Sequence, residues 1–377
     1  MKHVAFCILP NHPHVGPTLP VVSVMVRRGY RVSYATTDRF SSRVRSAGAD
    51  VTAYGFDGFE VHRPDWLTQW ISSQLDLISH LYERDRPDLI IYDEWGFAAY
   101  IIARHYGIPA VYTGPSYALD RRCLADQVPH ETFRRGVLEF SATIDGVLAN
   151  FGVFDADWLF HRASLNLYLC PRLFQPVPDS LDDSCFFAGR CAGEQPWYGN
   201  WKRATAGARP LVMVATSTNI VQGPQYFQTW VRALKDIECE VILSIGDRAN
   251  PLDFQELPGN IELVQNVSHV SILPRVSLYV GCGGIISSAE AAYHGVPMVI
   301  TSVGNAEIEW EAANLERVGL AVHVSDQEMR GAGLSQIVVS TLENTSMLRN
   351  VREIRRAIRK EPGAEEAVNR VETLLGW

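Results

Sequence analysis

Short apolar runs alternate with amphipathic stretches along the first half of the chain. The runs predicted to be strands are residues 4–9, 31–35, 51–54, 89–92, 110–113 and 166–170, and we expect the run at 166–170 to be the last strand of this half. Apolar positions three and four residues apart predict helices at 18–28, 38–46 and 97–106, a longer one inside 56–85, and a mostly helical stretch at 115–165. Such βαβ alternation predicts a parallel, doubly wound sheet with right-handed crossovers.

The same alternation restarts after residue 210. Strands are expected at 211–215, 241–245, 261–264, 276–280 and 298–301, helices at 225–234 and 285–293, and two amphipathic helices in the tail at 346–375. Residues 171–210 are rich in Pro, Gly, Asp and Trp, which is typical of an interdomain connection. We therefore predict an α/β protein of two Rossmann-like, doubly wound domains that face a cleft, with ligands at the carboxyl ends of the strands.

The length of 377 residues suits two domains of roughly 150–200 residues each. We expect a first domain at 1–190, a linker at 191–209 and a second domain at 210–355. The last segment, 356–377, is expected to form a helix that crosses back to the first domain.

Composition argues against several classes of protein. A net charge of −8 disfavours nucleic acid as a partner, and no run reaches the ~18 apolar residues of a membrane-spanning helix. The seven cysteines are scattered without a Cys-x-x-Cys pair, which indicates reduced thiols and neither a disulfide framework nor a zinc site. The chain begins directly with a predicted strand, so no signal peptide is expected. These features predict a cytoplasmic protein without a membrane anchor.

A glycine cluster separates a predicted strand from a predicted helix in the second half. Gly281, Gly283 and Gly284 allow a ligand to approach the backbone, and the helix behind them offers free N–H groups to an anion. Ser287 and Ser288 add hydroxyl groups in the first turn, and Glu290 follows within a turn, where it can accept from a sugar hydroxyl. The alternative is an ordinary βα turn of an α/β sheet.

Two polar side chains follow strands of the first predicted sheet. His14 lies in the turn after the first strand, and Asp93 lies at the carboxyl end of the strand at 89–92. A histidine held by a carboxylate is a general base near neutral pH, because the carboxylate fixes the tautomer and stabilises the imidazolium. The alternatives are a water-satisfied turn histidine and a helix N-cap, and His12 and Glu94 are equally placed as base and carboxylate.

Aromatic side chains gather in the same half. Trp66, Trp70, Trp95 and Phe97 are candidates for an apolar acceptor pocket, and the alternative is that they belong to the core. His-Glu-x-x-His, the Walker loop and Gly-x-Ser-x-Gly are absent from the sequence.

Taken in order, these motifs make the chain resemble the macrolide-type family 1 glycosyltransferases, which share the two-Rossmann GT-B fold. The stretch His12-Pro-His-Val-Gly-Pro-Thr-Leu19 is similar to the family's Gly-His-Val-Asn-Pro-x-Leu turn, whose His is the catalytic base and maps onto His14. Pro87-Asp-Leu-Ile-Ile-Tyr-Asp93 resembles the strand that precedes the partner aspartate. The segments 257–263, 271–274 and 294–298 also resemble family positions that lead into or follow the donor site.

The departures from the family fall in the nucleotide-sugar site. Asn266-Val-Ser-His269 stands where the family has Trp/Tyr-x-Pro-Gln, Cys282-Gly-Gly284 where it has His-x-Gly, and Glu307-Ile308 where it has Asp-Gln. The early Ser-Gly/Ser turn reads Thr216-Ser-Thr218, whereas Ser-x-Glu is intact as Ser288-Ala-Glu290. Losing a stacking aromatic and a cationic donor weakens donor binding by about a few kcal/mol. An unusual deoxysugar nucleotide is therefore a candidate donor.

The resemblance implies an inverting, metal-independent glycosyltransferase that moves a sugar from a UDP- or TDP-linked donor to a hydroxyl of an apolar natural product. It implies His14 as general base, oriented by Asp93. The residues expected at the donor are Ser217, Thr218, Asn266, His269, Cys282, Gly283, Gly284, Ser287, Ser288, Glu290 and Glu307. Those expected at the acceptor are His12, Trp66, Trp70 and Trp95. We expect no cofactor or metal, no nucleic-acid or membrane partner, and a monomer or homodimer.

Two other functions are compatible with the same residues. One is a catalytically silent GT-B protein that partners another glycosyltransferase, which the altered donor site suggests. The other is a GT-B epimerase of nucleotide sugars, which acts on the donor alone.

Overall fold

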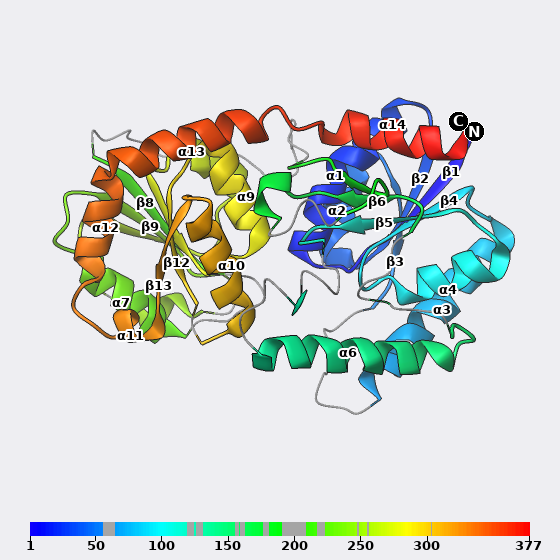
Figure 1. Cartoon of the computed structure of the whole chain (residues 1–377), viewed down its shortest axis with the longest axis horizontal. Helices are drawn as coiled ribbons and strands as arrows, with labels where there is room; N and C mark the ends of the chain where they lie inside the picture. Colours follow the sequence, from blue (N-terminus) through cyan, green and yellow to red (C-terminus); the bar gives the residue numbers. More distant parts are fainter. Residues whose placement is uncertain are drawn as a thin grey trace. The chain divides into compact units, whose positions relative to one another are not determined.

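The computed structural model of the chain describes residues 1–55, 65–118, 124–125, 131–154, 158, 163–175, 181–190, 209–216, 223–246, 249–254, 256–302 and 304–377. The chain divides into two compact units (Figure 1). Unit 1 consists of Met1–Trp197 together with Glu361–Trp377, and unit 2 of Tyr198–Lys360.

Unit 1 is built on a seven-stranded sheet in which every neighbouring pair is parallel. Its strands are β1 (His3–Cys7), β2 (Arg31–Thr36), β3 (Asp50–Ala53), β4 (Leu89–Tyr92), β5 (Ala110–Gly114), β6 (Asn166–Tyr168) and β7 (Cys185–Phe187). They lie in the order β3-β2-β1-β4-β5-β6-β7, so the direction of winding reverses between β1 and β4. The predicted doubly wound sheet is therefore confirmed in this half.

Helices cover both faces of this sheet (Figure 1). They are α1 (His12–Arg27), α2 (Asp38–Ser46), α3 (Trp66–Arg84), α4 (Phe97–Tyr106), α6 (Glu131–Ala149) and α14 (Gly363–Leu375). One apolar cluster joins α1, α2 and α14 to the sheet, and another joins α3, α4 and α6 to its opposite face. α14 packs on α1 through buried Ala367, Val368 and Val371, and Arg28 at the end of α1 pairs with Glu365 and Glu372.

Two expectations for unit 1 were wrong. α1 begins at His12 and not near residue 18, because Asn11 caps the helix by accepting from the N–H of His12, and Pro13 in the first turn needs no N–H partner. The strand at 166–170 is not the last of this half, because β7 pairs with β6 inside the stretch interpreted as a connection. β7 is only three residues long, too short for an alternating pattern to be visible.

Unit 2 has a six-stranded parallel sheet in the order β10-β9-β8-β11-β12-β13. Its strands are β8 (Leu211–Ala215), β9 (Glu240–Ser244), β10 (Ile261–Val264), β11 (Leu278–Gly281), β12 (Met298–Thr301) and β13 (Ala321–Val324). Its helices are α7 (Pro224–Leu234), α8 (His269–Ile272), α9 (Ile285–His294), α10 (Ala306–Arg317), α11 (Asp326–Met329), α12 (Leu334–Glu343) and α13 (Thr345–Ile358). The strand order is that of a Rossmann domain, and it reverses between β8 and β11.

The described helices include none that is long and apolar enough to cross a membrane.

Candidate active site

The carboxyl ends of β1 and β4 meet where the winding of unit 1 reverses, which is where doubly wound sheets bind ligands. Each strand continues into a helix within a few residues, β1 into α1 and β4 into α4. His14 is the third residue of α1, and Asp93 directly follows β4. The sequence placed His14 in a turn, whereas the structure places it in the first turn of a helix.

His14 and Asp93 form a buried hydrogen-bonded pair. His14 Nδ1 lies 2.8 Å from Asp93 Oδ2, and the two residues are 8% and 1% exposed. The same carboxylate accepts the N–H of Leu9 at 2.9 Å through Oδ2 and that of Trp95 at 3.0 Å through Oδ1. These bonds prevent rotation of the carboxylate, so Nδ1–H donates to a fixed partner and Nε2 is the nitrogen that can take a proton.

The surroundings of His14 favour its protonated form. Burial by itself lowers the pKa of His14, but the hydrogen bond to Asp93 and the charges of Glu94 and Asp93 outweigh it, so the pKa is raised above the usual value. A base with a raised pKa binds a transferred proton more tightly.

His12, the other candidate base, meets a different partner. Its Nδ1 lies 2.9 Å from Arg43 Nη1, which can only donate, and its ring contacts the ring of Phe40 edge-on. The structure therefore brings His14, and not His12, to Asp93.

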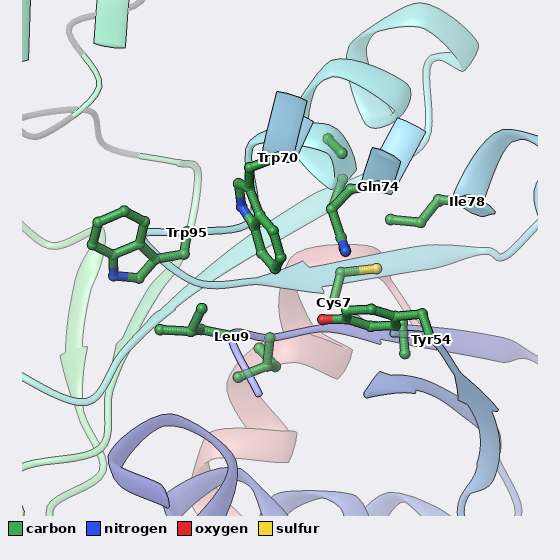
Figure 2. Close-up of a pocket in the computed structure, with 12 residues that line it drawn as sticks. Cys7, Leu9, Tyr54, Trp70, Gln74, Ile78 and Trp95 are labelled. Atoms are coloured by element: carbon green, nitrogen blue, oxygen red, sulfur yellow. The ribbon is translucent and has the colours of Figure 1, made fainter. Parts of the chain in front are cut away.

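A small cavity lies next to the two backbone segments that hold Asp93. Leu9 and Trp95, whose N–H groups hold Asp93, also line this cavity with Tyr54, Trp70 and Gln74 (Figure 2). The lining combines apolar side chains such as Leu9, Ile78 and Trp95 with the polar groups of Cys7, Tyr54 and Gln74. The free volume is about 10 Å³, which is room for about one water molecule. A larger ligand would have to move side chains of the wall.

The three tryptophans expected at the acceptor are partly buried, and two of them line the cavity. Trp70 and Trp95 line the cavity. Trp66 contacts Trp95, with ring centroids 6.2 Å apart, but does not line it. All three pack against the cluster that joins α3 and α4 to the sheet, which confirms that they belong to the edge of the core, whereas their role in binding an acceptor stays a prediction.

In unit 2, the turn between β11 and α9 requires a glycine. Gly283 has φ +78°, and a Cβ there would lie 2.6 Å from Ile300 Cγ2, so only glycine fits. Gly284 is the N-cap of α9, and the hydroxyl of Ser287 donates to its carbonyl at 2.9 Å. Ser288 is fully buried, and its hydroxyl has no hydrogen-bond partner among the described residues. A buried hydroxyl beside a helix N-terminus suits an oxygen-rich ligand.

Two more candidate donor residues pair with each other. His269 Nδ1, at the start of α8, lies 3.3 Å from Glu290 Oε2 on α9, and both side chains are largely buried. The ring of His269 also contacts Tyr279 edge-on. The sequence named both residues but did not predict their contact.

The other residues expected at the donor site differ in exposure and lie on separate elements. Asn266 is exposed in the loop after β10, and Cys282 is only 2% exposed. Glu307 lies exposed in the first turn of α10, one turn before the buried Glu311, whose pKa is raised by burial and by Glu307. Ser217 and Thr218 lie outside the described residues.

Sequence reasoning missed one close neighbour of the pair. Glu94 was considered only as a substitute for Asp93, yet its Oε1 lies 3.9 Å from His14 Nε2 while Asp93 holds the other nitrogen. The sequence feature that could have indicated this contact is the pair of consecutive acids, Asp93 and Glu94, after one strand. The part of the chain that the structure describes contains no group of three or more His, Cys, Asp or Glu side chains that could hold a metal ion.

Comparisons with known proteins find similar sequences and folds. Residues 228–374 match the family described as erythromycin biosynthesis protein CIII-like, C-terminal domain. The chain is 28% identical to NDP-glycosyltransferase YjiC of Bacillus licheniformis, covering 99% of this chain and 98% of that one. It is also 28% identical to demethyllactenocin mycarosyltransferase of Streptomyces fradiae, covering 100% and 87%. Among solved structures, the calicheamicin glycosyltransferase CalG4 superimposes with a TM-score of 0.81 at 24% identity, covering 100% of this chain and 98% of that one.

Proposed function

We propose that this chain, which has the GT-B fold, is a family 1 glycosyltransferase of the secondary-metabolite type. It transfers a sugar, with inversion, from a UDP- or TDP-linked donor to a hydroxyl of an apolar natural product. In this proposal unit 1 binds the acceptor and unit 2 binds the nucleotide sugar. The observation that carries it is the buried His14–Asp93 pair, whose carboxylate is held by the N–H groups of Leu9 and Trp95, two residues that line a small cavity.

His14 acts as general base. Its Nε2 takes the proton of the acceptor hydroxyl while that oxygen attacks the anomeric carbon and the bond to the nucleotide diphosphate breaks. Asp93 holds Nδ1 and stabilises the imidazolium that forms. The proton ends on His14, and the diphosphate leaves with one more negative charge.

The leaving diphosphate needs a compensating positive potential. The N-terminus of α9 supplies free N–H groups and the positive end of its dipole, and Ser288 supplies a buried hydroxyl. These groups support a reaction without a metal. In this proposal Glu290, which pairs with His269, binds the ribose hydroxyls, and Glu307 binds the hexose. Ser217, Thr218 and Cys282 are proposed to line the path of the phosphates.

The remaining features of the enzyme are also part of the proposal. Five buried cysteines form no disulfide, which supports a reducing, cytoplasmic location; they are Cys7, Cys170, Cys185, Cys239 and Cys282. We propose a monomer or homodimer that works without nucleic acid, membrane or cofactor.

One measurement tests the donor site. Thermal shift with UDP, TDP, GDP and their common sugars should raise Tm by several degrees with one nucleotide, since a ligand at 100 times its Kd adds about 2.7 kcal/mol. Transfer from that donor to a panel of apolar hydroxyl acceptors should then be lost in His14→Ala.

A silent GT-B partner of another glycosyltransferase is the second candidate. Exposed Asn266 in place of a stacking aromatic and buried Cys282 in place of a histidine favour it. The absence of a thermal shift with every nucleotide, in a cooperatively folded sample, would support this candidate over the enzyme.

A further inference from the structure

A second carboxylate faces His14 from the side opposite Asp93. Glu94 Oε1 lies 3.9 Å from His14 Nε2, whereas Asp93 Oδ2 lies 2.8 Å from Nδ1. The two acids are consecutive in the chain and directly follow β4. Each nitrogen of one imidazole therefore faces a different carboxylate.

Glu94 is held in this place from two directions. The hydroxyl of Tyr112, on β5, donates to Glu94 Oε2 at 3.2 Å, and the indole N–H of Trp158 donates to the Glu94 carbonyl at 2.8 Å. Burial and the charge of Glu94 raise the pKa of Tyr112 well above its usual range, so its hydroxyl stays protonated and remains a donor. Oε2 accepts from Tyr112, and Oε1 is the oxygen that lies 3.9 Å from His14 Nε2.

The two carboxylates differ in exposure. The side chain of Asp93 is 1% exposed and that of Glu94 29% exposed. Asp93 is enclosed by its three donors, whereas Glu94 is partly exposed and lies near Nε2, the nitrogen that must meet the acceptor. Asp93 therefore orients the imidazole ring, and Glu94 stabilises the positive charge that forms when Nε2 takes the proton.

Building on the proposed function, we propose that Glu94 is a positioning residue that stabilises the imidazolium of His14 during proton transfer, with Tyr112 holding it in place. In that step the acceptor O–H bond breaks, the Nε2–H bond forms, and Glu94 neither gains nor loses a proton. The developing cation lies between two carboxylates instead of beside one, so the base binds the proton more tightly.

Few other described charges face this ring. Those that act on it are Asp93 and Glu94, both from the segment after β4, and Tyr112 reaches it only through Glu94. Arg43, from α2, contacts the ring of His12 instead. Glu94→Gln keeps the shape and removes one of the two charges, which makes it the informative substitution.

The test is a histidine titration followed by NMR, with His14 assigned from the signal missing in His14→Asn. Glu94→Gln should lower the pKa of His14 by about half a unit or more, Tyr112→Phe should lower it less, and Glu94→Asp, which keeps the charge, should restore part of the shift. The acid limb of kcat/KM should move to lower pH in parallel, and the plateau at high pH should fall several-fold.

An unchanged His14 titration and acid limb in Glu94→Gln, with only the plateau reduced, would overturn the proposal and leave Glu94 a structural or acceptor-binding role. A titration unchanged in Glu94→Gln but shifted in Tyr112→Phe would overturn it as well. Failure of the proposed function is a separate result, namely no transfer by wild type with any donor, and the NMR titration does not depend on it.

Discussion

The N–H of Leu9 donates to Asp93 Oδ2 at 2.9 Å, although the two residues are 84 positions apart in the chain. Because Leu9 follows β1 and Asp93 follows β4, this bond joins the two strand ends at the point where the sheet reverses. The side chain of Leu9 lines the cavity and its backbone holds the carboxylate that orients His14. Cavity shape and base orientation are therefore coupled through one residue.

Replacing Asp93 by Asn should nearly abolish transfer. Asn keeps the size of the side chain but removes the charge that fixes the His14 tautomer, so we expect kcat/KM to fall about 10²–10⁴-fold. Leaving one buried donor unsatisfied should also lower the free energy of unfolding by about 1–3 kcal/mol. Steady-state kinetics and urea denaturation of the same samples measure both. Activity within about threefold of wild type would contradict the assignment.

The raised pKa of His14 predicts opposite effects of pH on activity and stability. A base must be deprotonated, so kcat/KM should fall about tenfold per pH unit below the pKa of His14, with an acid limb above the ordinary value of about 6.5. Because the pKa is higher in the folded state than in the unfolded chain, His14 contributes stability that is fully present below about pH 6.5 and is lost as pH rises through its folded pKa.

The matched control is the non-titrating variant His14→Asn. Its deficit in free energy of unfolding, measured against wild type by denaturation at several pH values, should be larger at pH 5.5 than at pH 9. A deficit that is constant, or that grows with pH, would contradict the raised pKa.

Gly283→Ala should damage the proposed donor site. The added methyl group would lie 2.6 Å from Ile300 Cγ2, and the alanine would have to adopt φ +78°. We therefore expect a loss of about 1–3 kcal/mol in the free energy of unfolding and weaker nucleotide binding. Gly246→Ala is the control, since Gly246 has φ +72° but nothing within 4 Å of the added methyl. It should lose less stability and keep the nucleotide-induced thermal shift. Equal binding by the two variants would argue against a ligand at the Gly283 turn.

Asn266→Trp should tighten nucleotide binding. The side chain is exposed in the loop after β10, and an aromatic there would restore a surface for the base, worth about 1–3 kcal/mol by stacking. Isothermal titration with the nucleotide found by thermal shift measures the gain. Gln265→Trp, at the neighbouring exposed position, should leave Kd unchanged. Weaker binding by Asn266→Trp would place the base elsewhere.

Trp70→Ala should change acceptor selection without affecting the donor. Trp70 lines the cavity beside Tyr54. Replacing it by Ala enlarges the cavity, whose volume is about 10 Å³, by roughly the volume of an indole ring. We therefore expect KM for acceptors to change by about tenfold or more. Trp66→Ala removes an equivalent ring that does not line the cavity, and its acceptor KM should change less. Identical acceptor profiles for the two variants would show that this cavity does not bind the acceptor.

The pattern of the sequence was sufficient for every strand of the two sheets except β7 and β13, and for the strand ends that carry the site. Continuous apolar runs such as Leu89–Tyr92 are long enough to be recognised alone, and parallel strands bring their carboxyl ends to one edge. His14 and Asp93 were predicted together for this reason. β7 and the start of α1 were missed, because three residues carry no period and because a Pro-rich segment is equally typical of a turn or a first helical turn.

The choice between His12 and His14 depended on the tertiary structure. Both follow β1, and a turn offers no reason to prefer either. Once α1 begins at His12, the two side chains point about 200° apart around the helix, so only one can face Asp93. The contact of Glu94 with the second nitrogen, and that of His269 with Glu290, depend in the same way on how separate elements pack. The sequence alone determined which strands are followed by candidate catalytic residues, because hydrophobic periodicity is a local property of the chain. Tertiary packing decided which side chains meet, because the distances between separate elements cannot be read from local sequence.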